Sequence, residues 1–249
     1  MDADYAFLYR GAIALNNIGV ALMQQHRFRD AMDTITDSVA AIQACLPGSP
    51  QLNRETLVKR LHDASKRNFA SSCVNVPDDG VLVVSVEDSD IFSTLHHNEG
   101  LYTDKDTFCP IRIRHAAESE DGSAAVDFQT AVVLFNMGLT HLALARQQRQ
   151  ESDAAACRTA GLHVLRLGYS IVYNRFLNSS EDSDSNDEDR VLLMAMILKK
   201  VILALKELRM FSQAEEAYDA LLVLDKAMKQ MDCFEVFEEQ YIPCPASAA

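Results

Sequence analysis

Seven segments of the 249-residue chain place apolar residues at the three- and four-residue spacing of an amphipathic helix, and none of them contains a proline. The whole sequence has only nine glycines and six prolines, so few points interrupt helix formation. Apolar residues make up 48% of the chain, which is enough to build a hydrophobic core at this length. We therefore expect a mainly α-helical protein. The predicted helices cover residues 5–25, 29–44, 51–71, 124–145, 152–174, 190–208 and 212–231.

The first two predicted helices are joined by a very short connection. Only residues 25–28 lie between them, and a connection of that length forces two helices to pack antiparallel. Residues 46–50 contain two prolines and a glycine and end the second helix. We expect a single helical domain over residues 1–249, built from antiparallel helix pairs.

An insertion at residues 72–120 departs from this helical pattern. Residues 81–86 are rich in β-branched side chains and follow a turn sequence, which predicts a strand. Residues 110–113, Pro-Ile-Arg-Ile, alternate apolar and charged side chains and predict a second short strand. Two strands alone are marginal in water, so this small β insertion is expected to lie against the helices.

A second departure is the acidic stretch at residues 178–189, which contains no apolar side chain and is predicted to be a flexible loop. Asp182, Asp184 and Asn186 resemble the start of a calcium-binding loop. The glycine and the closing glutamate of such a loop are missing, so we expect no metal site here.

Charge and composition limit the partners and the location that we expect. The formal net charge of −13 disfavours nucleic acid and anionic membrane surfaces as partners. The only basic cluster, at residues 54–67, is interrupted by Glu55 and Asp63 and is expected to be a solvated helix face. The longest apolar run, residues 191–198, is far shorter than the roughly 20 residues of a membrane span. With no paired cysteine spacing and no secretory signal pattern, we expect a cytoplasmic protein, and a nuclear location stays open.

One residue pattern recurs in part along the chain. In its first occurrence, Gly19 is followed after nine residues by Phe28 and after twelve by Ala31. A glycine and an alanine at these positions allow paired helices to approach closely, while the aromatic side chain fills the turn between them. In a second stretch Gly138 keeps the first half of the pattern.

The second and third occurrences of this residue pattern are partial, and together with the first they indicate a repeat family. The small residue that matches Gly138 is expected at Ala156 or Ala160 after an insertion, and a third stretch keeps Phe211 and Ala214. This pattern resembles the tetratricopeptide repeat over about half of the chain. The resemblance implies helix pairs stacked as a short α-solenoid. The order of segments also resembles a group of algal proteins, chiefly from diatoms, from which no function can be transferred.

The resemblance also implies a binding site. In tetratricopeptide proteins the first helix of each pair lines a groove, where an asparagine often binds the backbone of an extended peptide. Asn17 and Asn136 occupy that position, and a carboxamide carries the donor and the acceptor that pairing with a peptide group requires. Lys200 falls at the same place in the third stretch and would suit a carboxylate. The expected apolar lining, which favours an apolar or helical ligand, includes Ile13, Val20, Phe135 and Leu139.

Two alternatives stay open for this site. The asparagines can instead bond to backbone carbonyls between the repeats. The insertion at residues 72–120 can also occupy the groove itself.

The function implied is that of a protein–protein interaction scaffold without enzymatic activity and without a cofactor. The sequence contains no nucleophile elbow, no glycine-rich phosphate loop and no zinc-binding motif. A helical enzyme or small-molecule carrier with an apolar pocket that these motifs do not reveal is the alternative. Self-association through exposed apolar faces or strand edges is a further possibility.

Overall fold

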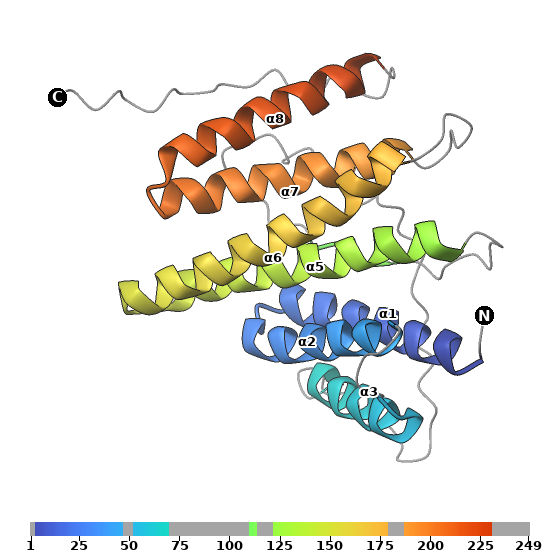
Figure 1. Ribbon diagram of the computed structural model, residues 1–249. Coiled ribbons are helices and arrows are strands. Elements are labelled where there is room, and N and C mark those ends of the chain that lie inside the picture. The colour runs from blue at the N-terminus through green and yellow to red at the C-terminus, as the bar shows by residue number, and fades with distance from the viewer. Residues whose placement is uncertain (1–2, 47–51, 70–109, 114–121, 179–186, 231–249) are drawn as a thin grey trace.

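The computed structural model describes residues 3–46, 52–69, 110–113, 122–178 and 187–230 (Figure 1). These residues are mainly helical, as expected, and every predicted helix is found within a few residues of its predicted ends. The first predicted strand, at residues 81–86, lies outside the described residues. The helices are α1 (Ala3–Gln24), α2 (Phe28–Ala44), α3 (Arg54–Phe69), α5 (Gly122–Gln147), α6 (Glu151–Asn178), α7 (Asp187–Glu207) and α8 (Phe211–Gln230).

Six of these helices form three antiparallel pairs, α1 with α2, α5 with α6, and α7 with α8 (Figure 1). Three residues connect the helices of each pair, at 25–27, 148–150 and 208–210. The pairs also contact one another, because α2 packs against α5 and α6 packs against α7. Helix α3 packs on α1 and α2 at one end of the stack, and its first turn is capped by the Asn53 side chain, which accepts the Thr56 N–H at 2.7 Å.

Both ends of the acidic stretch belong to helices. Asn178 is the last residue of α6, and residues 187–189 form the first turn of α7. Helix α7 therefore begins at Asp187, before its predicted start at residue 190. The residues between Asn178 and Asp187 lie outside the described part of the chain.

Gly19 allows α1 and α2 to pack closely. A Cβ atom at this position would lie 2.5 Å from Ile35 Cγ1 and 3.6 Å from the Ala31 carbonyl oxygen, both on α2. Ala31 itself is completely buried. The glycine and the alanine of the first pair therefore face each other's helix, as the residue pattern predicted.

The second pair makes the same kind of contact at a different place. A Cβ atom on Gly138 would lie 2.6 Å from Leu165 Cγ and 3.4 Å from the Gly161 carbonyl oxygen. Gly161 is therefore the small residue that faces Gly138, and the expected Ala156 and Ala160 are not. The reason is that α5 and α6 are longer than α1 and α2, with 26 and 28 residues against 22 and 17, so the contact lies further from the connection.

The turns before α2 and α8 have the same backbone conformation. His26 and Arg209 both have a φ of 59°, in the left-handed region. In each turn the N–H of this residue bonds to the carbonyl three residues earlier, and the next N–H bonds to the carbonyl five residues earlier, which is a Schellman motif. Phe28 packs against the core, but Phe211 is 47% exposed, so the expectation that an aromatic side chain fills this turn fails in the third pair.

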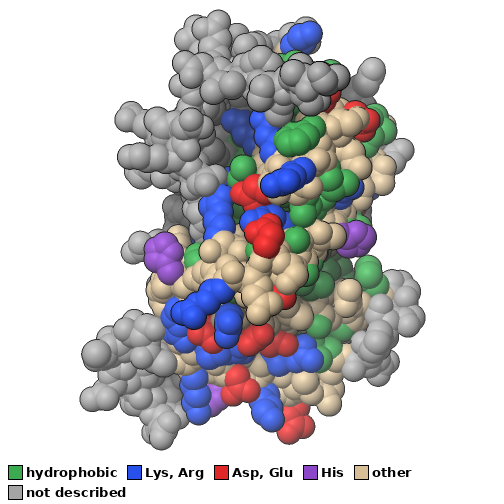
Figure 2. All heavy atoms as spheres, turned by 90° about the vertical axis from the view of Figure 1, so that its left-hand side faces the viewer, with side chains coloured by type: hydrophobic (Ala, Val, Ile, Leu, Met, Phe, Trp, Pro, Cys, Tyr) green, Lys and Arg blue, Asp and Glu red, His purple; other side chains and the backbone are tan. Residues whose placement is uncertain are grey.

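The basic cluster of α3 faces acidic side chains of α2. Arg60 lies 3.0 Å from Asp37, while Arg67 lies 3.6 Å from Asp33 and 4.0 Å from Asp37. Figure 2 shows acidic and basic side chains intermingled at this end of the molecule. The cluster is thus partly neutralised within the protein and does not form a continuous basic surface.

Among the described residues, two helical segments are long and apolar enough to cross a membrane, Tyr5–Gln24 and Val126–Gln147. Most of each segment is buried against the other helices. The core helices of soluble proteins have the same length and composition.

We expect Gly138→Ala to destabilise the protein relative to Gly168→Ala. Both changes gain the helix propensity of alanine, but the nearest atom to a Cβ at Gly168 is 3.4 Å away, which is an ordinary contact. The difference isolates the overpacking at Leu165, for which we expect about 1–3 kcal/mol in the free energy of unfolding. Urea denaturation of the two variants measures it. Equal stability would show that α5 and α6 do not pack closely at Gly138.

Candidate functional site

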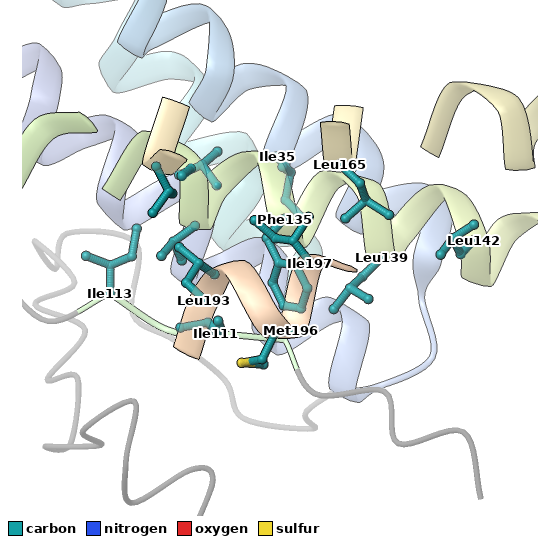
Figure 3. Close-up of a cluster of buried hydrophobic side chains, with 14 of the residues drawn as sticks. Ile35, Ile111, Ile113, Phe135, Leu139, Leu142, Leu165, Leu193, Met196 and Ile197 are labelled. Atoms are coloured by element: carbon teal, nitrogen blue, oxygen red, sulfur yellow. The ribbon is translucent and has the colours of Figure 1, made fainter. Parts of the chain in front are cut away.

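The four residues 110–113 cross the helices at the faces of α1 and α5. Ile111 and Ile113 are 3% and 6% exposed and belong to the main hydrophobic core. Figure 3 shows both side chains at the edge of the cluster that contains Phe135 of α5 and Leu193 of α7. The segment is therefore part of the core, although it comes from the insertion between α3 and α5.

Asn136 of α5 pairs with the backbone of Ile111 through both ends of its carboxamide. The Ile111 N–H donates to Asn136 Oδ1 at 2.8 Å, and Asn136 Nδ2 donates to the Ile111 carbonyl oxygen at 2.7 Å. The Asn136 side chain is completely buried. One carboxamide thus satisfies both backbone groups of one residue away from water.

Asn17 of α1 repeats this arrangement two residues further along the segment. The Ile113 N–H donates to Asn17 Oδ1 at 2.9 Å, and Asn17 Nδ2 donates to the Ile113 carbonyl oxygen at 2.9 Å. Because backbone groups two residues apart point to the same edge of an extended chain, α1 and α5 read the same edge of the segment.

Asn16, which the sequence analysis missed, connects the two pairs. Its Oδ1 accepts a hydrogen bond from Asn136 Nδ2 at 3.0 Å, and its own Nδ2 lies 3.3 Å from Asn17 Oδ1 and 3.4 Å from the Ile111 carbonyl oxygen. The signal for it was two consecutive asparagines in an otherwise apolar helix face. Buried carboxamides are costly unless they are hydrogen-bonded, so such a pair predicts mutual partners or a bound peptide group.

The second predicted strand is not formed at residues 110–113. The described residues contain no strand, and these four have no regular secondary structure. The physical reason is that the backbone groups of Ile111 and Ile113 pair with asparagine side chains instead of with a neighbouring strand. Apolar and charged side chains do alternate in this segment, but asparagine side chains on helices, and not a second strand, form its hydrogen bonds.

Helices α1 and α5 lie side by side in a constant register. Asn16 bonds to Asn136, and Tyr9, two turns earlier on α1, donates its hydroxyl hydrogen to Gln129 Oε1 on α5; each pair is separated by 120 residues. Burial raises the pKa of the Tyr9 hydroxyl, so it remains protonated and able to donate. This second contact helps to hold the asparagines of both helices beside the segment.

The other expected binding residues lie on α1, α5 and α7. Lys200 is half-buried on α7. The expected apolar lining is buried within the described structure, with exposed fractions of 3% for Ile13, 0% for Val20, 0% for Phe135 and 2% for Leu139. Ile13, Phe135 and Leu139 belong to the same core cluster as Ile111 and Ile113, and none of the four side chains offers an open surface.

No group of three or more histidine, cysteine or acidic side chains suitable for a metal ion occurs among the described residues. Comparison with known proteins finds no matching family model, no matching curated protein and no matching solved structure.

We expect Asn136→Ala to release residues 110–113 from the helices. The change removes both hydrogen bonds to Ile111, which are worth about 1 kcal/mol each, and leaves buried backbone groups without partners. The Ile111 amide should then exchange its hydrogen faster, and trypsin should cleave after Arg112 more readily. Asn68→Ala is the matched control, because that carboxamide makes an exposed hydrogen bond to Gln25. Unchanged exchange in Asn136→Ala would contradict the pairing.

Acid should destabilise the protein through His141. Burial lowers the pKa of this α5 side chain from its ordinary value near 6.5, so the unfolded chain binds its proton more tightly. Its contribution to stability is complete above pH 6.5 and is lost as the pH falls. We expect His141→Gln to lose less stability than the wild-type protein between pH 7.5 and 5.5, in urea titrations at both values. Identical pH dependence of the variant and the wild-type protein would contradict the burial effect.

Proposed function

We propose that this protein is an interaction scaffold that binds an extended peptide of a protein partner on the carboxamides of Asn17 and Asn136. One observation carries the proposal: each of these side chains pairs with the N–H and the carbonyl of a single residue, Ile113 and Ile111. Such pairing depends on the extended backbone and not on the side chain, so it suits any peptide that can reach the site in this conformation.

A tetratricopeptide-like α-solenoid is the architecture that we propose for the stack. The close contact at Gly19 recurs at Gly138, and the turn at His26 recurs at Arg209. The contacts of α2 with α5 and of α6 with α7 also follow the order of such a stack. The longer α5–α6 pair departs from the repeat.

The proposed partner is a protein or peptide in the cytoplasm, with no nucleic acid, no membrane and no cofactor involved. The net charge of −13 supports this choice of partner class. We propose Lys200 on α7 as a further contact residue, whose ammonium group would suit a ligand carboxylate. We propose no enzymatic activity. The carboxamides of the site are neutral groups that bind and orient a peptide group, and they act neither as a nucleophile nor as a general base.

A fluorescein-labelled peptide of residues 109–115, with serine in place of Cys109, tests the proposal. We expect saturable binding by fluorescence anisotropy, either to the full chain or to the variant Ile111→Ala with Ile113→Ala. Asn17→Ala should weaken binding about tenfold, because it removes two hydrogen bonds of about 0.5–1.5 kcal/mol each.

The matched control is the same peptide N-methylated at both isoleucines. It keeps every side chain but loses the two N–H groups that the carboxamide oxygens accept. Equal binding of the two peptides, or no saturable binding to either protein, would refute the proposed function.

A further inference from the structure

We propose that residues 110–113 are a built-in competitor, and that a partner peptide binds by replacing them. The inference rests on the proposed function, because it assigns the segment and the partner to the same site. The partner class that follows is an extended peptide with aliphatic side chains at alternate positions.

The aliphatic positions follow from burial. Ile111 and Ile113 point into the core from the residues whose backbones are paired, and they are 3% and 6% exposed. A replacement peptide must fill the same space, because a smaller side chain would leave a cavity in a packed core. Polar side chains at these positions would be buried without partners.

The middle residue of the segment fits less well. Arg112 Nη2 donates to Gln24 Oε1 at 2.8 Å, but Arg112 Nε is buried and has no hydrogen-bond partner among the described residues. A buried, unsatisfied donor on a charged group is unfavourable. A peptide with an uncharged middle side chain avoids this defect, so it can compete with the segment that belongs to the chain.

A site with no peptide bound is unfavourable. The partner peptide is therefore expected to replace residues 110–113 directly, without a stable state in which the site is empty. Without a peptide group, the buried carboxamides of Asn17 and Asn136 would each lose both of their backbone partners, and Asn16 would lose the Ile111 carbonyl oxygen. A segment attached to the same chain also has a high effective concentration at its own site. The unbound protein is therefore expected to be closed by its own segment.

The labelled peptide of residues 109–115 tests this inference when it is titrated into two proteins. It should bind the variant Ile111→Ala with Ile113→Ala at least tenfold more tightly than the wild-type chain, because the variant's own segment fills the core poorly. Circular dichroism and a cooperative urea transition establish that the variant is folded. Equal affinity for the two proteins would overturn the competitor and leave the proposed function intact. Absence of binding to both would overturn the proposed function as well.

A second peptide tests the middle position. Norleucine in place of its central arginine keeps the alkyl chain but removes the guanidinium group. We expect at least threefold tighter binding to the wild-type chain than with arginine. Equal or weaker binding would overturn the preference for an uncharged middle residue.

Hydrogen exchange of the wild-type chain tests the displacement of residues 110–113 without relying on a variant that must fold. When the norleucine peptide saturates the wild-type protein, the amides of Ile111 and Ile113 should exchange faster, while the helical amides of α1 and α5 keep their protection. Unchanged or slower exchange at saturation would show that the peptide binds elsewhere, and the competitor would be overturned.

Discussion

The pairing of asparagine carboxamides with the backbone of residues 110–113 is the interaction on which the centre of the molecule depends. A buried carboxamide is unfavourable without hydrogen bonds, and so are the backbone groups of an extended segment that has no neighbouring strand. Asn17 and Asn136 resolve both problems at once, since each supplies the donor and the acceptor that one residue requires. Two helices and a distant segment can therefore share one apolar core.

In α1 and α5 a short motif, an asparagine two residues before a glycine, sets the contacts on two sides of the helix. Asn17 precedes Gly19 by two residues, and Asn136 precedes Gly138 by two. Residues two apart on an α-helix point in nearly opposite directions, because each residue turns the helix by about 100°. The glycine therefore contacts the paired helix while the asparagine faces the segment. Close packing of the pair and pairing with residues 110–113 are thus set by the same three residues.

The helices were predictable because their signals are local. Apolar spacing and proline positions located all seven described helices, with errors of a few residues at their ends. The contacts between helices were less accessible. Gly161, not Ala156 or Ala160, faces Gly138, since the contact depends on how far two helices extend before they turn. Phe211 has the predicted sequence position but is exposed, because burial depends on which other elements cover a turn.

The sequence by itself determined the helical class and the antiparallel pairing, and its resemblance to the tetratricopeptide repeat singled out Asn17 and Asn136. The first two properties follow from neighbouring residues, and the carboxamide chemistry of the asparagines supports the third. Only the tertiary structure decided that Asn17 meets Ile113, which is 96 residues away, and that Asn16 completes the site. Sequence spacing cannot specify such a contact, because the position of residues 110–113 depends on how separate helix pairs stack and on which buried polar groups remain to be satisfied.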